Sequence, residues 1–267
     1  MLTVGIAGLG AIGLTLAKAL DAGVEGLRLV AVAARDRDKA RAAVAGFASP
    51  PVVTDVADLA GLADVVVEAA PAAAFEAIVS PAIEAGRIAV VSSVGALLPR
   101  MQLVERARET GARIIVPTGA LLGLDAVRAA AEGKVESVTL VTRKPPRGLA
   151  GAPYLEQHGI DVTTITTPTR VFAGSAREGA IGFPANVNVA AALALAGIEP
   201  DRTRLEIWAD PTVTRNTHTV TVEADTVRLT MTIENVPSEE NPRTGKITPL
   251  SLLACLRGLT ATLKVGT

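Results

Sequence analysis

The N-terminal residues contain the feature that most constrains how this chain folds. An apolar run from Leu2 to Ala7 leads directly into three glycines spaced as Gly-x-Gly-x-x-Gly, at Gly8, Gly10 and Gly13. A strand, a tight turn and a helix start in this order are typical of a dinucleotide-binding unit. The glycines permit a sharp turn, a close approach of a pyrophosphate and close packing of the helix on the strand. A plain βα turn is the alternative interpretation.

The pyrophosphate of a bound dinucleotide would face the positive end of the first helix dipole. We therefore assign cofactor binding at this turn to five residues, which are Gly8, Gly10, Ala11, Ile12 and Gly13.

The end of the second predicted strand bears on the choice between NAD and NADP. An acid at this point usually binds the ribose hydroxyls and favours NAD, whereas a nearby arginine accommodates the phosphate of NADP. Here the strand 27–34 ends in alanine and is followed by Arg35 and Asp36. We assign both side chains to the cofactor site and expect NADP to be accepted beside NAD. The alternative is that both are solvated surface charges.

Composition narrows the fold class and the partners. The 267 residues suggest two domains or one large α/β unit, and 49% are hydrophobic but only 2% aromatic. The core must therefore consist of Ala, Val, Leu and Ile, as in parallel strands and the helices that cover them. A net charge of -1 offers no broad attraction to nucleic acid or an anionic membrane, so we expect small-molecule partners.

The termini and cysteine usage indicate a cytoplasmic protein. The chain enters its first strand without a signal sequence, and no run of about 18 uninterrupted apolar residues is present. The single cysteine, Cys255, lies in an apolar pattern that fits a core position in a reducing compartment. His158 and His218 are the only histidines, and no His/Cys cluster has zinc-ligand spacing, so we expect no metal site.

Strands and helices alternate over the first 117 residues. Further strands are predicted at 27–34, 51–54, 63–70, 88–93 and 113–117, with helices between them. This alternation predicts a Rossmann-type doubly wound parallel sheet.

The pattern changes in the second half, where strand-like segments alternate Thr or charged residues with apolar ones. They are 135–143, 170–173, 205–208, 217–222 and 227–233, the last two forming a hairpin, with one helix at 187–196 inserted between strands. A final helix at 249–263 carries a leucine stripe that needs an apolar surface, which we place on the nucleotide-binding domain. We therefore predict a nucleotide-binding domain of residues 1–117 plus 238–267, and a second α/β domain of residues 118–237 on a mixed or antiparallel sheet.

Several segments beyond the first domain have unusual compositions. They are Pro117–Asp125, Arg143–Pro146, Phe183–Ala190, Ala209–Pro211 with Asn216–His218, and Asn235–Thr244. Together with the opening glycine turn, in this order and over almost the whole chain, they resemble the L-aspartate dehydrogenase family. The resemblance implies NAD(P)-dependent conversion of L-aspartate to iminoaspartate, then to oxaloacetate and ammonia, and the reverse amination. It also implies a Rossmann domain completed by the C-terminal segment and a homo-oligomer, which we expect to be a dimer.

Two departures from the family's motifs concern the substrate site. One glycine of the family's Ser-Gly-Ala-Ile-Gly-Gly run is replaced by Leu122, which narrows the expected site. The family's Asn-Pro-Lys-Thr-Ser loop is here Asn241–Gly245, which keeps a positive charge but changes the geometry.

Oxidation of an amino acid needs a neutral amine and water that hydrolyses the imine, so a group that titrates near neutrality is useful. His218 follows Asn216 at the start of a predicted strand and matches the family's catalytic histidine. We assign it the removal of a proton from the substrate ammonium or from the hydrolytic water. A hydrogen-bonded structural histidine is the alternative. His158 is interpreted as a residue at the C-terminal end of a surface helix.

Small and amide side chains are assigned to the rest of the cofactor site. The family match places Asn186 and Asn188 next to the nicotinamide, although asparagine also caps helices. Ala120 follows a predicted strand, at the sheet edge where ligands gather, and its small side chain lets the ring lie flat. Ala70 ends another strand and is expected to line the same site through its backbone, with a plain loop as the alternative.

The two carboxylates of L-aspartate call for positive charge or backbone donors. Lys144, Arg143 and Arg243 are the candidates, and the sequence does not choose among them. Asp210 either orients His218 or starts a turn before Pro211, and we favour the turn. Two other functions stay open, namely a dehydrogenase or imine reductase for another small dicarboxylate and a non-catalytic NAD(P)-binding sensor. For an aspartate dehydrogenase, we expect a role in nicotinamide cofactor synthesis or aspartate catabolism.

Overall fold

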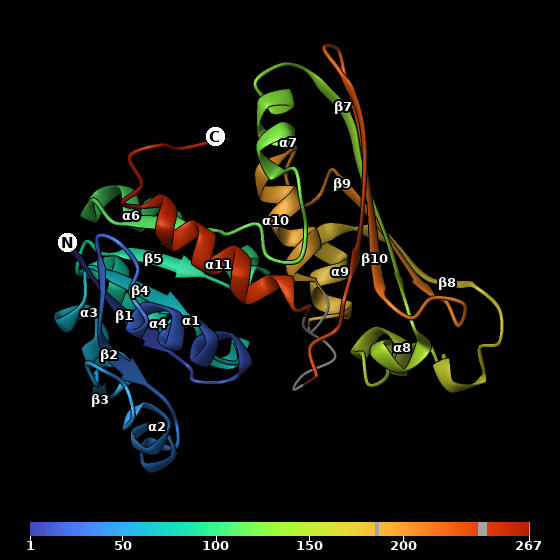
Figure 1. The fold of residues 1–267 in the computed structure, drawn as a ribbon. Helices are drawn as coiled ribbons and strands as arrows, with labels where there is room; N and C mark the ends of the chain where they lie inside the picture. Colours follow the sequence, from blue (N-terminus) through green and yellow to red (C-terminus); the bar gives the residue numbers. More distant parts are fainter. Residues whose placement is uncertain (185–186, 240–244, 267) are drawn as a thin grey trace. The chain divides into compact units, whose positions relative to one another are not determined.

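A computed structural model describes residues 1–184, 187–239 and 245–266, which form two compact units (Figure 1). The first unit comprises Met1–Pro117 and Pro249–Thr267, and the second comprises Thr118–Thr248. The sequence had placed the second boundary earlier, between residues 237 and 238.

The first unit is built on a six-stranded parallel sheet with the order β3-β2-β1-β4-β5-β6. Its strands are β1 Leu2–Ala7, β2 Leu27–Ala33, β3 Val52–Thr54, β4 Val65–Glu68, β5 Ile88–Val91 and β6 Arg113–Ile115. The order reverses between β1 and β4, and ligands of open α/β sheets bind beyond the carboxyl ends of the strands at such a switch point. The predicted Rossmann-type sheet is confirmed.

Helices cover both faces of this sheet. They are α1 Ala11–Asp21, α2 Arg37–Val44, α3 Leu59–Leu62, α4 Phe75–Glu84, α5 Val94–Leu97, α6 Gln102–Thr110 and α11 Ile247–Gly258, with short 3₁₀ turns η1 Val56–Asp58, η2 Ala72–Ala74 and η3 Leu98–Arg100. On one face, Leu16 and Leu20 of α1 join Leu252 and Leu256 of α11 in a fully buried cluster with the strand valines. On the other face, α3 approaches β1 closely, because a Cβ at Gly5 would lie 3.1 Å from Ala63 and Leu59.

The C-terminal helix packs on the core of the first unit, as predicted, but it is shorter than predicted. It ends at Gly258 rather than near residue 263, and Leu263 is exposed. Just beyond this end, the Thr260 hydroxyl donates to the Glu25 carbonyl at 2.8 Å, which fixes the chain against the α1–β2 connection. Cys255 is partly buried against the same core, and burial raises the pKa of its thiol.

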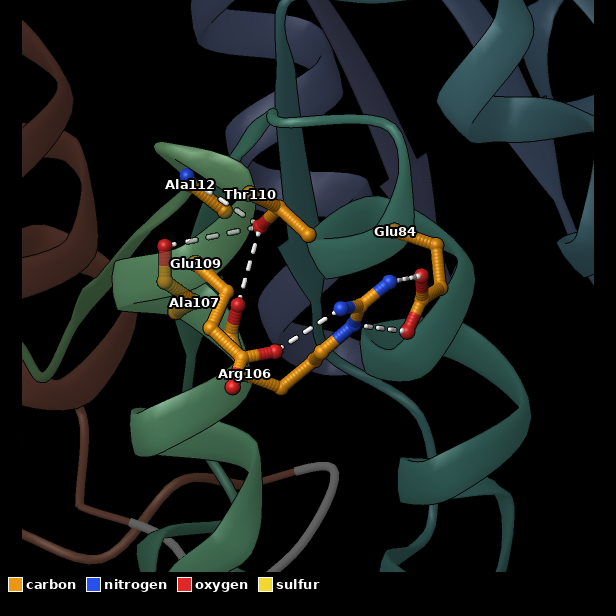
Figure 2. Close-up of polar contacts among 6 residues, drawn as sticks. All are labelled: Glu84, Arg106, Ala107, Glu109, Thr110 and Ala112. Carbon is orange, nitrogen blue, oxygen red and sulfur yellow. Dashed lines mark hydrogen bonds and ion pairs between the residues drawn. The ribbon is translucent and has the colours of Figure 1, made fainter.

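An exposed ion-pair network joins α6 to α4 on the surface of the first unit (Figure 2). Arg106 donates from Nε and Nη2 to the two oxygens of Glu84, at 2.8 and 2.6 Å, and from Nη1 to Glu109 at 2.8 Å. The hydroxyl of Thr110, the last residue of α6 before the C-cap Gly111, donates to the Arg106 carbonyl at 3.2 Å. Because the charged groups are exposed to water, these ion pairs add little to the free energy of unfolding. They link α6 to α4.

The second unit contains a five-stranded sheet with the order β11-β10-β7-β9-β8. It is mixed, which is one of the two alternatives that the sequence left open. Only the β7–β9 pair is parallel within this sheet. Its strands are β7 Val135–Lys144, β8 Thr169–Ser175, β9 Thr203–Ala209, β10 Asn216–Ala224 and β11 Arg228–Asn235. The predicted hairpin is the β10–β11 pair.

Helices cover one face of the second sheet (Figure 1). They are α7 Leu124–Ala131, α8 Pro153–Gln157, α9 Ala176–Gly182 and α10 Asn188–Ala196, with 3₁₀ turns η4 Pro146–Leu149 and η5 Val162–Thr164. The helix predicted at 187–196 is α10, and the surface helix expected to end near His158 is α8. The sequence did not predict α7 or α9. The start of α9 has a recognisable signal, because Ser175 and Glu178 form a reciprocal capping box.

Within the described ranges, no helix has both the length and the apolar character needed to cross a membrane.

Candidate functional site

The glycine turn after β1 has the geometry of a phosphate cradle. Gly8 adopts φ +95°, and its N–H donates to the Ala33 carbonyl at 2.7 Å. A Cβ at Gly8 would lie 2.5 Å from the Ala69 carbonyl oxygen, and one at Gly13 would lie 1.8 Å from the Gly8 oxygen. Neither position tolerates a side chain without a shift of the backbone.

Gly10 differs from both, because a Cβ there would meet no protein atom within 4 Å. Gly10 is the N-cap of α1, it supplies no side-chain cap, and no acidic residue lies in the first turn. The open space therefore lies at a helix start whose first residues are Ala11 and Ile12. Backbone N–H groups at such a start bind phosphate, so the residues present fit a dinucleotide pyrophosphate.

Arg35 and Asp36 follow β2 and differ in what they do. The Asp36 carboxylate accepts the Lys39 backbone N–H at 3.0 Å and so caps α2. Arg35 is exposed. Asp36 is exposed as well, so both charges face solvent, but only the Asp36 side chain also serves as a helix cap.

A buried carboxylate that the sequence analysis did not single out lies at the end of β4. Glu68 is 0% exposed and accepts from the Ser92 and Ser93 backbone N–H groups, at 3.0 and 2.8 Å, and from the Ser93 hydroxyl at 2.9 Å. Burial raises the pKa of this carboxyl, and the Ser93 bonds oppose that effect. Glu68 thereby ties the ends of β4 and β5 together beside Ala70, whose carbonyl lies 3.5 Å from the Ser93 hydroxyl.

In the second unit, polar side chains gather at one end of the helix-covered face. Along β7 the inward positions change from Val138 and Leu140 to Thr142 and Lys144. His218 of β10 is paired in register with Thr142, and its Nδ1 lies 3.0 Å from the Thr142 Oγ1. Lys144 lies two residues further along β7 on the same face.

Burial and charge keep the His218 imidazole neutral. His218 is 3% exposed and Lys144 is 5% exposed. Desolvation, together with the charge of Lys144, lowers the pKa of His218 to about 3. The site thus combines a neutral imidazole with a buried ammonium group.

Asp210 and Arg143 belong to a different arrangement. Asp210 accepts the Thr212 N–H at 2.9 Å and the Thr212 hydroxyl at 2.6 Å, which is the turn that the sequence favoured. Its other oxygen accepts from Arg143 at 3.1 Å, and the Arg143 guanidinium lies 4.6 Å from the centre of the Trp208 ring. Burial raises the pKa of the Asp210 carboxyl, but the Thr212 and Arg143 bonds outweigh it and leave the pKa lowered. Of the two candidate cations that the structure describes, Lys144 is therefore the one that acts on His218.

The loop that contains Ala120 is held by the end of β11. Gly119 adopts φ +66°, and the Ala120 carbonyl accepts from the Asn235 Nδ2 at 2.8 Å. Asn235 is 3% exposed and is paired in register with Asn216 of β10. The loop, Asn235 and His218 thus belong to the same end of the second sheet.

Other predicted residues lie elsewhere or outside the described residues. Asn186 and Arg243 fall in the ranges that the structure does not describe. Asn188 is the first residue of α10, and the N-cap is Val187, which makes no side-chain cap bond. His158 ends α8 at the surface, where it stacks on Tyr154 with 3.9 Å between ring centres.

Thr142, Glu68 and Asn235 were not assigned roles from the sequence. Two of them had a signal in the sequence. Thr142 is a polar residue at an inward position next to apolar ones in Val138–Lys144, and Glu68 is an acid that ends the apolar run Val65–Glu68. Asn235 lies within a segment that was noted only for its composition.

Two family models match the chain. Residues 125–259 match the model described as aspartate dehydrogenase, C-terminal. Residues 8–117 match the model described as homoserine dehydrogenase, NAD binding domain.

Curated relatives are similar over the full chain. The L-aspartate dehydrogenase of Bradyrhizobium diazoefficiens is 57% identical. The match covers 100% of this chain and 94% of that protein. L-aspartate dehydrogenase 3 of Bordetella bronchiseptica is 52% identical, and the match covers 100% of this chain and 98% of that protein. The L-aspartate dehydrogenase of Methanosarcina barkeri is 40% identical, with both chains covered over 100%.

Solved structures share the fold. The aspartate dehydrogenase of Thermotoga maritima has a TM-score of 0.75 at 24% identity, with both chains covered over 100%. A homoserine dehydrogenase of Thiobacillus denitrificans has a TM-score of 0.62 at 16% identity, covering 97% of this chain and 73% of that one.

Proposed function

Because this chain belongs to the L-aspartate dehydrogenase family, we propose how its own residues carry out the oxidation of L-aspartate. The chain is an NAD(P)-dependent oxidoreductase that acts on a CH–NH2 group and converts L-aspartate to iminoaspartate, which water converts to oxaloacetate and ammonia. The observation that carries the proposal is the neutral, buried His218 next to the buried cation Lys144 on one face of the second sheet.

Gly8, Gly10, Ala11, Ile12 and Gly13 would hold the cofactor's pyrophosphate. The open space at Gly10 and the start of α1 support this assignment. Ala70, Ala120, Asn186 and Asn188 are proposed to contact the cofactor as well. When bound, the nicotinamide ring accepts a hydride from the substrate's α-carbon.

His218 is proposed to take a proton from the substrate ammonium, so that the amine lone pair can form the C=N bond as the hydride leaves. Alternatively, the one proton that His218 accepts comes from the water that attacks the imine carbon. The Thr142 bond to Nδ1 leaves Nε2 as the nitrogen for this proton transfer. A dicarboxylate bound near Lys144 would counter the positive charge that lowers the pKa of His218, and would so make the imidazole a better base.

Lys144 is proposed to bind a substrate carboxylate. Its burial in the same polar cluster as His218, and the effect of its charge on the pKa of His218, support this role. A buried ammonium attracts a carboxylate more strongly than a surface lysine does, because water screens the pair less.

For the cofactor preference, the exposed Arg35 and the use of Asp36 as a helix cap support acceptance of NADP beside NAD. We also propose that the chain assembles as a homo-oligomer, expected to be a dimer, and acts in the cytoplasm. Light scattering on the purified protein tests the assembly, and a monomer would contradict it.

The experiment that tests the function measures absorbance at the reduced-nicotinamide band with oxaloacetate, ammonia and either NADH or NADPH. We expect oxidation of the cofactor that requires both oxaloacetate and ammonia. Turnover with another 2-oxo dicarboxylate but not with oxaloacetate would instead favour a different substrate. Cofactor binding without any turnover would favour a sensor.

The role of His218 is tested with His218→Ala. General acid–base catalysis contributes about 10²- to 10⁴-fold, so kcat should fall by that factor while the cofactor Kd stays unchanged. Near-normal turnover with an unaltered pH profile would exclude the role.

A further inference from the structure

We propose that Asn235 binds the amino nitrogen of the substrate through its side-chain oxygen, Oδ1. The inference rests on the proposed function, because it names the group that receives the amine in the same site. It assigns a specificity-determining residue to the end of β11.

The Asn235 carboxamide is held in one orientation. Its Nδ2 donates to the Ala120 carbonyl at 2.8 Å, so the nitrogen must face the 118–123 loop and Oδ1 must face away from it. A Cβ at Gly245 would lie 3.2 Å from Oδ1, so the backbone at Gly245 packs against the carboxamide. The side chain is thus fixed on both sides.

Oδ1 is a buried acceptor. Asn235 is 3% exposed, and within the described part of the chain Oδ1 has no hydrogen-bond partner. Leaving such an atom unpaired is costly, and native proteins seldom keep one without a ligand or water that completes it. Oδ1 therefore points to a ligand group that donates a hydrogen bond.

The strand register places Asn235 diagonally across from His218. Asn235 is opposite Asn216, and His218 follows Asn216 by two residues, so all three share one face of the β10–β11 pair. Diagonal neighbours on such a pair lie about 7–8 Å apart at Cα, so that one ligand group can contact both side chains. The nitrogen from which His218 would remove a proton has further N–H bonds to donate, and the proposal assigns one of them to Oδ1.

The chemistry of the substrate selects the amine. At neutral pH the two carboxylates of L-aspartate only accept hydrogen bonds, and its ammonium is the one group that donates. Oxaloacetate has no donor in its ionised form, so in the reverse reaction ammonia is the reactant that Oδ1 can bind. An acceptor at this point therefore favours the binding of ammonia or an amine over the binding of ligands that have no N–H to donate.

Two substitutions separate this role from the support of Ala120. Asn235→Ala and Asn235→Asp both remove the Nδ2 donor to Ala120, but Asn235→Asp keeps an acceptor oxygen. Initial rates of oxaloacetate amination give separate KM values for ammonia, oxaloacetate and NADH. Cofactor Kd values come from NADH fluorescence, and Tm values from thermal unfolding.

We expect Asn235→Ala to lower kcat/KM for ammonia by about ten- to a hundredfold, and Asn235→Asp to keep it within about threefold of the wild type. The inhibition constant of succinate, a dicarboxylate without an amine, should stay unchanged in both. Loss of the Ala120 bond should lower the Tm, and any change in the cofactor Kd should be the same in the two variants. Glu234→Ala, on the opposite face of β11, is the control that keeps wild-type values.

The inference is overturned if the two variants change the ammonia KM equally, or if neither changes it. A selective change in the cofactor Kd of Asn235→Ala would instead assign Oδ1 to the nicotinamide carboxamide. If the wild type fails to aminate oxaloacetate, the proposed function fails and this inference fails with it. If the wild type aminates oxaloacetate but kcat/KM for ammonia does not differ between Asn235→Ala and Asn235→Asp, only this inference is overturned.

Discussion

The Nδ1 atom of His218 lies 3.0 Å from the Oγ1 atom of Thr142, across the antiparallel β7–β10 pair. The two residues are far apart in the sequence, and the strand register alone makes them neighbours. Because a hydrogen bond at one ring nitrogen sets the tautomer and the orientation of the ring, Thr142 prepares His218 for proton transfer at Nε2.

Replacing Thr142 tests this positioning role. Thr142→Val keeps the shape but removes Oγ1, and we expect kcat to fall about tenfold, as for the loss of one hydrogen bond. Thr142→Ser keeps the hydroxyl and should retain most of the activity. The cofactor Kd should be the same in both variants. A valine variant with the kcat and pH profile of the wild type would remove Thr142 from the mechanism.

The lowered pKa of His218 predicts a loss of stability in acid. The pKa is about 3 in the folded protein, whereas an unperturbed histidine has a pKa of about 6.5. Between these values the unfolded chain binds a proton that the folded protein does not. The free energy of unfolding should therefore fall as the pH falls, by up to about 1.4 kcal/mol per pH unit from this residue.

His218→Gln, which takes up no proton, should reduce this slope. Urea unfolding between about pH 5 and pH 7 measures it for both proteins. His158→Gln makes the same substitution at an exposed histidine at the end of α8 and is the matched control. Equal slopes for all three proteins would mean that His218 is not held neutral by folding.

The glycine turn predicts different results for two alanine substitutions. Gly13→Ala places a Cβ 1.8 Å from the Gly8 carbonyl oxygen, so we expect a loss of about 2 kcal/mol or more in stability. Gly10→Ala meets no protein atom within 4 Å, and its Tm should stay close to that of the wild type. Its cofactor Kd should nevertheless rise at least about tenfold, because the methyl group occupies the space that the pyrophosphate approaches. Unaltered cofactor affinity in Gly10→Ala would place the pyrophosphate elsewhere.

Arg35→Ser tests how the chain accepts NADP. The KM for NADPH should rise about tenfold or more through the loss of a charge-assisted hydrogen bond, and the KM for NADH should change less than about twofold. Arg41→Ser, on the exposed surface of α2, is the control for a general loss of positive charge. A parallel rise in both KM values would show that Arg35 does not read the ribose phosphate.

Much of the fold follows from local patterns in the sequence. The apolar strands and the glycine turn were predictable because parallel strands are buried on both faces and the motif has fixed spacing. The helix α9 escaped prediction because it is short and contains two glycines, so that tertiary packing decides it. The end of α11 at Gly258 depends likewise on the contact of Thr260 with Glu25.

The candidate site was predictable only in part, for a related reason. His218 and Lys144 were named from their chemistry, but Thr142 and Asn235 gain meaning only from strand register. The sequence does not state which residue of β7 or β11 lies opposite a given residue of β10. That register places Thr142 and Ile233 beside His218, and Asn235 beside Asn216.

The packing of α11 also affects when the first unit can finish folding during synthesis. Leu252 and Leu256 are fully buried against strands that are synthesised before the second unit. The ribosome therefore completes the whole second unit before the nucleotide-binding core receives its last leucines. Until then, α11 does not cover the apolar surface of Leu16 and Leu20. Nascent chains can bind chaperones or associate with one another through this exposed surface.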